Sequence, residues 1–123
     1  MKTVLCFLMG VLSVSGADAK ADYAHLAKAI EVKELNTLMF AKSSDANLAK
    51  VEAFLKAHPK AAEREQALYL LAYMKWSLHR YAVAAPAYAA LLKEFPKTKF
   101  LRIALIREAA AHLFNGRADL ALP

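Results

Sequence analysis

The stretch EQALYLLAYMKWSLHRYAVAAPAYAALLKEFP, residues 65–96, contains two helical patterns separated by a short polar turn. In its first half, Leu68, Leu71 and Ala72 follow the i, i+3, i+4 spacing of one buried helix face. In its second half, apolar residues repeat at helical spacing up to Phe95, and the proline that follows ends the helix because a residue before proline avoids the helical conformation. The stretch therefore predicts a helical hairpin.

The first helix of this hairpin carries a second, aromatic stripe. Tyr69, Tyr73 and Trp76 are spaced i, i+4, i+7, which places their side chains on one face. A helix with two apolar faces needs two neighbours, or one neighbour and a ligand. The stripe therefore indicates either a binding surface or core packing against flanking helices, and both interpretations remain open for each ring.

The composition predicts a single all-α domain. Of 123 residues, 59% are hydrophobic and 27 are alanine, while only 3 are glycine, so helix formers far outnumber turn formers. The formal net charge is +6, and residues 75–123 account for +5 of it. This basic excess favours an acidic partner or an anionic surface near the C-terminal part, although a solvated helix face would explain it equally well.

Residues 1–19 have the pattern of a signal peptide. Lys2 supplies the positive start, residues 3–14 the apolar run, and Ala17-Asp18-Ala19 the small-x-small cleavage pattern. The run is too short and interrupted for a membrane span, which needs about 20 apolar residues. Removal of this segment takes away the single cysteine, which excludes a disulfide framework and a thiolate metal site from the mature chain. We expect a periplasmic or secreted protein with a domain at residues 20–123.

The mature chain is expected to form helices joined by short links. The apolar periodicity, the polar cap at residues 43–45 and the stops at prolines predict helices over residues 22–42, 46–58, 61–78, 82–95 and 99–114. Asn115-Gly116 is expected to cap the last helix. Pro86 is expected to delay the start of the fourth helix or to bend it, since proline cannot donate a backbone hydrogen bond.

The central hairpin resembles a tetratricopeptide repeat. Residues 65–98 span 34 positions, the length of that repeat unit, and helix stops recur 37 residues apart at Pro59 and Pro96. The positions that carry the resemblance are Leu68, Leu71, Ala72, Tyr81, Ala84, Tyr88, Leu91, Leu92 and Pro96. Three positions depart from the repeat pattern: Lys75 stands where an aromatic is usual, His79 replaces a turn glycine, and Leu91, although it belongs to the matching apolar pair, replaces a small residue. One repeat is thus well matched, and the hairpins on either side of it match weakly.

The resemblance implies stacked antiparallel helical hairpins, about two and a half repeats, with a concave surface that binds a peptide or a partner helix. The expected concave residues are Val32, Asn36, Met39, Tyr69, Tyr73, Trp76, Ile106, Ala110 and Leu113. Within and beside that surface, the residues we expect to bind a partner are Tyr69, Tyr73, Trp76, Lys75, Arg80, Arg102, Ile106 and Arg107.

The sequence gives no support for an enzyme, a metal site or a cofactor. The histidines His25, His58, His79 and His112 are far apart and form no i, i+3 or i+4 pair, so a helical metal site is not indicated. There is no glycine-rich phosphate loop and no hydrolase motif. Export also argues against a nucleic-acid partner for this basic chain.

We therefore expect a non-catalytic protein–protein interaction module, an adaptor or chaperone-like protein of the bacterial cell envelope. One alternative is a basic protein that binds anionic lipid or cell-wall polymer at the envelope surface. Another is a homodimer formed through the C-terminal helix, because the apolar residues Leu101 and Leu105 have no expected cover within the chain.

Overall fold

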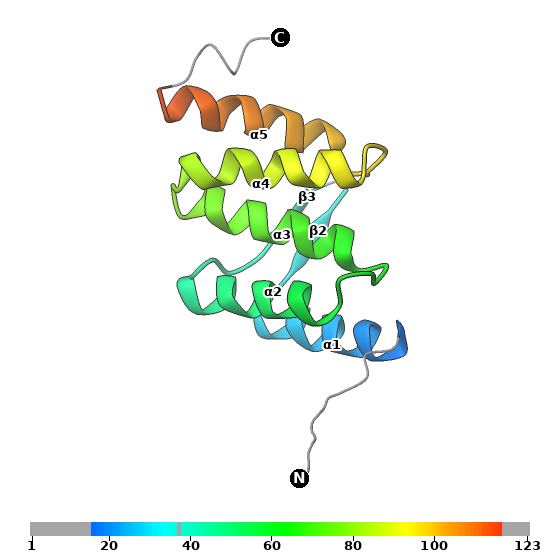
Figure 1. Cartoon of the computed structure of the whole chain (residues 1–123). Coiled ribbons are helices and arrows are strands. Elements are labelled where there is room, and N and C mark those ends of the chain that lie inside the picture. Colours follow the sequence, from blue (N-terminus) through cyan, green and yellow to red (C-terminus); the bar gives the residue numbers. More distant parts are fainter. Residues whose placement is uncertain (1–15, 37, 117–123) are drawn as a thin grey trace.

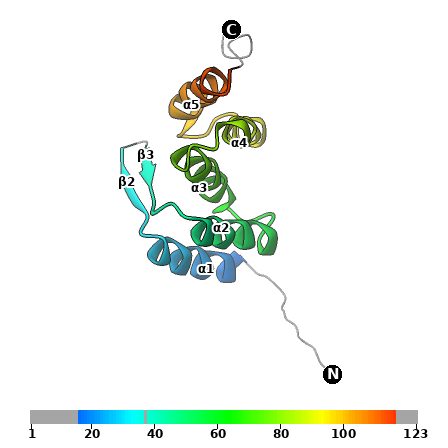
Figure 2. The same ribbon diagram turned by 90° about the vertical axis from the view of Figure 1, so that its left-hand side faces the viewer.

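The computed structural model describes residues 16–36 and 38–116 of the chain. This part is mostly helical, and its helices lie one after another in a stack with α1 and α5 at opposite ends (Figure 1). The helices are α1 (Gly16–Ala29), α2 (Asp45–Ala57), α3 (Arg64–Ser77), α4 (Tyr81–Glu94) and α5 (Leu101–Phe114). Two short strands, β2 (Lys33–Leu35) and β3 (Leu38–Phe40), form a hairpin beside α3, on the side away from α4 (Figure 2).

The helices predicted after residue 45 are confirmed, with bounds that differ by up to three residues from those expected. Gly116 adopts φ +77 directly after α5, the left-handed conformation expected of a glycine that closes a helix. Pro86 lies inside α4, which already begins at Tyr81, so the proline does not delay the helix. The two prolines expected to stop helices, Pro59 and Pro96, do follow the ends of α2 and α4.

The prediction of a single helix over residues 22–42 is wrong, because α1 ends at Ala29 and a β-hairpin follows it. Glu31 adopts φ 56, and the N–H of Val32 donates to the carbonyl of Ala27 at 2.8 Å. A left-handed residue with this backbone bond is the Schellman arrangement that closes helices. Glycine is usual at that position, and its absence hid the end of the helix. The expected all-α class therefore misses a small sheet.

The hairpin is antiparallel, and its register pairs Glu34 with Met39. Met39 is buried against the helical core. The ring of Phe40 meets that of Tyr73 on α3 edge to face, with centroids 6.2 Å apart. The Glu34 carboxylate lies 3.6 Å from the ammonium of Lys99, which precedes α5. Strands that would be marginal alone are thus held by contacts with α3 and with the segment that leads into α5.

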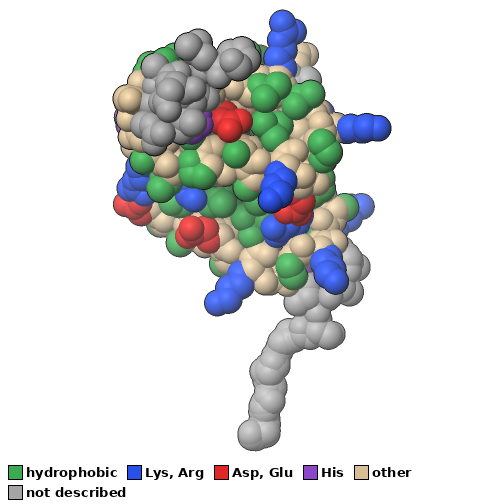
Figure 3. Space-filling view, turned by 45° about the horizontal axis from the view of Figure 1, so that its top comes forward, with side chains coloured by type: hydrophobic (Ala, Val, Ile, Leu, Met, Phe, Trp, Pro, Cys, Tyr) green, Lys and Arg blue, Asp and Glu red, His purple; other side chains and the backbone are tan. Residues whose placement is uncertain are grey.

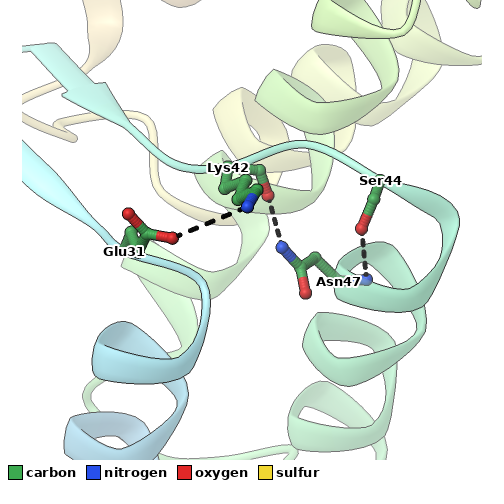
Figure 4. Close-up of polar contacts among 4 residues, drawn as sticks. All are labelled: Glu31, Lys42, Ser44 and Asn47. Atoms are coloured by element: carbon green, nitrogen blue, oxygen red, sulfur yellow. Dashed lines mark hydrogen bonds and ion pairs between the residues drawn. The ribbon is translucent and has the colours of Figure 1, made fainter.

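A small polar network fixes the segment between the hairpin and α2 (Figure 4). The Ser44 hydroxyl accepts a hydrogen bond from the backbone N–H of Asn47 at 3.0 Å and so caps α2. The buried Asn47 side chain donates to the carbonyl of Lys42 at 2.7 Å. The Lys42 ammonium lies 3.9 Å from the carboxylate of Glu31, which is a weak exposed pair.

The core is built around the aromatic residues of α3 and α4. Tyr69 and Tyr88 are completely buried, and the ring of Phe100 stacks on that of Tyr69 with centroids 4.2 Å apart. Offset and edge-to-face aromatic pairs of this kind add about 0.5–1.5 kcal/mol to the effect of burial. They tie the start of α5 to α3 across α4.

The expected signal peptide lies mostly outside the described residues, since residues 1–15 are not described. Residues 16–19 form the first turn of α1, and Ala19 is buried there. Cleavage after Ala19 would therefore leave α1 to begin at Lys20. In the part of the chain that the structure describes, no helix has both the length and the apolar composition needed to cross a membrane.

Candidate functional site

Arg107 on α5 lies at the centre of four aromatic residues from α3 and α4. Its Nη1 donates hydrogen bonds to the hydroxyls of Tyr69 at 3.0 Å and Tyr88 at 3.2 Å. Its guanidinium carbon lies 5.3 Å from the ring centroid of Tyr73 and 5.8 Å from that of Trp76. We call these five residues the Arg107 cluster. A guanidinium this close to aromatic rings gains cation–π attraction of about 0.5–2 kcal/mol.

Helical spacing brings these residues together. Tyr69, Tyr73 and Trp76 form the aromatic stripe of α3, as their i, i+4, i+7 spacing predicted. On α5, Ala104 and Ala111 are completely buried, so their small side chains mark the face that packs into the fold. Arg107 lies three residues after Ala104 and therefore close to this face.

The two tyrosine hydroxyls of the cluster are kept neutral by their surroundings. Burial raises the pKa of Tyr69 and of Tyr88, and the nearby charge of Arg107 offsets part of that rise. Tyr69 also donates a long hydrogen bond to the carbonyl of Met39 on β3, at 3.4 Å. The hydroxyl of Tyr69 therefore links the guanidinium on α5 to the hairpin.

The guanidinium of Arg107 retains unused donors. Among the described residues, neither Nε nor Nη2 makes a hydrogen bond, and no carboxylate lies within ion-pair distance. Several acidic side chains of the described chain are engaged elsewhere: Glu34 with Lys99, Asp45 with Arg80, Glu94 with Arg64, Glu108 with His112 and Glu65 with Thr98. The positive charge is thus solvated only in part and has no counter-charge among the residues that the structure describes.

Three further aromatic contacts extend the cluster toward the C-terminal end of α5. The ring of Trp76 lies 5.2 Å from that of Tyr81 and 5.8 Å from that of Phe114, and the last two are 5.1 Å apart. We call these three residues the aromatic triad. Phe114 is 62% exposed, so the triad presents an open apolar ring at the surface. His79 adjoins the triad through Tyr81, since its Nδ1 lies 2.7 Å from the Tyr81 hydroxyl oxygen.

The structure brings together four of the expected partner-binding residues in the Arg107 cluster: Tyr69, Tyr73, Trp76 and Arg107. Tyr69 belongs to the core, where its ring cannot contact a partner directly. Arg80 instead forms an ion pair with Asp45, at 2.6 Å, where α2 begins.

The remaining expected residues lie on other faces. Ile106 follows the buried Ala104 by two residues, which places it about 200° around α5, and it is 56% exposed. Arg102 shares this outer face, since it precedes Ile106 by four residues. Lys75 follows Tyr73 by two residues and points away from it for the same reason.

The expected concave set is corrected in the same way. Met39, on β3, is buried against the helical core. Leu113, seven residues after Ile106, lies with Ile106 on the outer face of α5. The residues that adjoin the stripe are instead Phe40, whose ring contacts that of Tyr73, and Phe114, whose ring contacts that of Trp76. Phe114 could have been found from its i+7 relation to Arg107, whereas Phe40 was assigned to a helix and could not.

The outer face of α5 is apolar and basic. Its exposed apolar side chains are Leu101, Leu105, Ile106 and Leu113. Figure 3, in which the α5 end comes forward, shows hydrophobic side chains gathered there, with Lys and Arg side chains projecting around them. This face is separate from the one that carries Arg107.

A second polar feature lies at the other end of the stack. His58 is 3% exposed, and its Nε2 lies 2.7 Å from the carboxylate of Asp22 on α1, while its Nδ1 has no hydrogen-bond partner among the described residues. An open hollow of about 360 Å³ adjoins the pair. The described residues that line this hollow include no Ser, Thr or Cys, so none of them places a hydroxyl or thiol nucleophile beside the Asp–His pair.

Within residues 16–36 and 38–116, no three His, Cys, Asp or Glu side chains lie close enough together to hold a metal ion. Comparisons with protein-family models, with curated protein sequences and with solved structures returned no match.

Proposed function

We propose that this protein is a non-catalytic binding module that docks a segment of a second protein against the Arg107 cluster and the aromatic triad. The observation that carries the proposal is the guanidinium of Arg107, half-buried among aromatic rings, whose Nε and Nη2 make no hydrogen bond to any described residue. Arginine, tyrosine and tryptophan are the residue types that supply most binding energy at protein interfaces.

The surroundings of the cluster support this role. Phe40, on the hairpin, is 38% exposed beside Tyr73, and Phe114 is exposed beside Trp76. A partner segment that covered these rings would remove apolar surface from water at about 25 cal/mol per Å². The hydrogen bonds of Tyr69 and Tyr88 already fix the guanidinium, so little side-chain ordering would be needed on binding.

The wider setting of the proposal is a tetratricopeptide-like stack of antiparallel hairpins in a bacterial envelope. Support for the hairpin comes from His79, whose φ of 61 and backbone bonds reverse the chain tightly between α3 and α4. Support for the envelope comes from the signal-like pattern of residues 1–19. In that setting the module acts as an adaptor or chaperone-like protein.

The proposal is tested by selecting random dodecapeptides on the immobilised protein and comparing three forms of it. Tyr73→Ala removes an aromatic wall of the Arg107 cluster and should release the selected peptides. Ile106→Ala is the matched control, because it removes a similar apolar side chain from the outer face of α5. Peptides retained equally by all three folded proteins, or no selected peptide at all, would contradict the proposal.

A second candidate function is self-association through the outer face of α5. It rests on the exposed apolar residues of that face, which have no cover within the described chain. Sedimentation velocity over a hundredfold concentration range tests it. A monomer–dimer equilibrium abolished by Leu105→Glu would support this candidate, and a monomer throughout would exclude it.

A further inference from the structure

We propose that Arg107 recognises one internal acidic side chain, Asp or Glu, of the bound segment. The inference rests on the proposed function and adds the chemistry of the partner to it. The partner is thus a protein segment in which a carboxylate is flanked by apolar residues.

The geometry of the guanidinium points to a carboxylate. An arginine side chain has five N–H donors in one plane, and two adjacent parallel donors match the two oxygens of a carboxylate. Nη1 is directed to the hydroxyls of Tyr69 and Tyr88. The donors of Nε and Nη2 are side by side on the other edge of the group, and no described residue accepts from them. This edge is the one that pairs with a carboxylate through two hydrogen bonds.

Charge complementarity also calls for an anion. The charge of Arg107 is partly withdrawn from water by the surrounding rings, and an incompletely solvated charge gains more from a counter-charge than an exposed one does. Glu34 and Glu108 cannot supply it where they stand, since they lie against Lys99 and His112. A carboxylate brought by the partner would complete the cluster.

The apolar rings beside the guanidinium favour a protein segment over a free anion. Phe40 lies on the hairpin side of Tyr73, and Phe114 lies on the far side of Trp76. An extended segment whose acidic residue met Arg107 would place its neighbouring side chains near these two rings. Apolar residues around the acid therefore match the site.

The test uses two synthetic peptide pools with amidated C-termini. Each peptide has five random positions on either side of a fixed centre, which is Asp in one pool and Asn in the other. We expect the wild-type protein to retain the Asp pool at least about tenfold better, as one charge-assisted hydrogen-bonded pair allows. Amidation ensures that no terminal carboxylate contributes.

Arg107→Gln should remove the preference for the Asp pool while leaving residual binding of both. Arg107→Lys, which keeps the charge but not the two parallel donors, should retain an intermediate preference and provides the answer if the glutamine variant fails to fold. Equal retention of the two pools by the wild type would overturn the inference and leave the proposed function standing. Retention of neither pool would count against both.

A lipid arm separates this partner from an anionic surface. Vesicles of phosphatidylcholine with one quarter phosphatidylglycerol are tested beside the pools, with wild type and Arg107→Gln. Vesicle binding that depended on Arg107, together with no preference for the Asp pool, would overturn the inference in favour of a lipid headgroup.

Discussion

The Nη1 atom of Arg107 lies 3.0 Å from the hydroxyl oxygen of Tyr69, and this bond joins α5 to α3 across the intervening α4. The same nitrogen reaches Tyr88 on α4 at 3.2 Å. One guanidinium therefore connects three consecutive helices from the face that also carries Tyr73 and Trp76. The arrangement gives the cluster a structural role, which holds α5 in place, beside the binding role that we propose.

Alkaline pH should destabilise the protein through its buried tyrosines. Burial raises the pKa of Tyr88 and Tyr69 above the ordinary value of 10.0, so the folded protein keeps protons that the unfolded chain loses. Stability should be constant with respect to these groups below pH 10 and should fall above it, by about 1.4 kcal/mol per pH unit for each such tyrosine. Thermal unfolding between pH 8 and 12 measures this.

The contribution of one tyrosine is isolated by Tyr88→Phe, which removes the titrating hydroxyl. The stability of this variant should depend less steeply on pH above 10 than that of the wild type. Identical slopes would mean that Tyr88 has the same pKa in both states.

His79→Gly should stabilise the protein by about 1 kcal/mol, because His79 adopts φ 61, which costs a residue with a side chain more than it costs glycine. The exposed hydrogen bond to Tyr81 is lost in the exchange and offsets part of the gain. His79→Ala loses the same bond but keeps the strain, so it serves as the control and should be less stable than wild type. Melting temperatures of the three proteins give the comparison. A His79→Gly variant that melted below the wild type would show that the conformation of His79 is not strained.

Ser44→Ala should destabilise the protein by about 1 kcal/mol, because the hydroxyl caps the first turn of α2. Ser44→Asp retains an acceptor at the cap and should stay near wild type. Urea denaturation measures the free energy of unfolding of each. Equal losses for both variants would show that the cap is not the cause.

Asp22→Ala should cost about 1–3 kcal/mol, because it leaves the buried Nε2 of His58 without a partner in addition to the unpaired Nδ1. Asp22→Asn keeps a hydrogen-bonding group at the same place and should lose less. The loss should vanish if His58 is replaced by Phe, which a double-mutant cycle on thermal unfolding would reveal. If the stability losses of the two single variants simply added in the double variant, Asp22 and His58 would not be energetically coupled, and the prediction would fail.

Helical periodicity predicted most of the fold because α2 to α5 obey local rules. The apolar spacing of residues such as Leu68 and Ala72, and the chain breaks at proline, depend on neighbours a few positions away. The hairpin was missed because the closing residue of α1 is Glu31 and not glycine. Its strands are held by distant partners such as Tyr73, which no local pattern records.

The candidate site was predictable only in part. The stripe of Tyr73 and Trp76 was visible from its spacing, but the same spacing could not tell that Tyr69 is fully buried. The pairing of Arg107 with Tyr88, like that of Asp22 with His58, joins residues on different helices. The rotation of α5 placed Arg107 beside the stripe and Ile106 on the outer face, a difference of one position that the sequence pattern did not resolve.

The most direct test of the account is the nuclear magnetic resonance spectrum of the ¹⁵N-labelled protein during titration with a peptide selected from the dodecapeptide library. Trp76 is the single tryptophan, so its indole N–H gives one unambiguous signal, and the Nε–H of Arg107 provides a second within the same cluster. We predict that both signals move together and saturate at one dissociation constant. A bound peptide that left both signals unchanged would contradict the account.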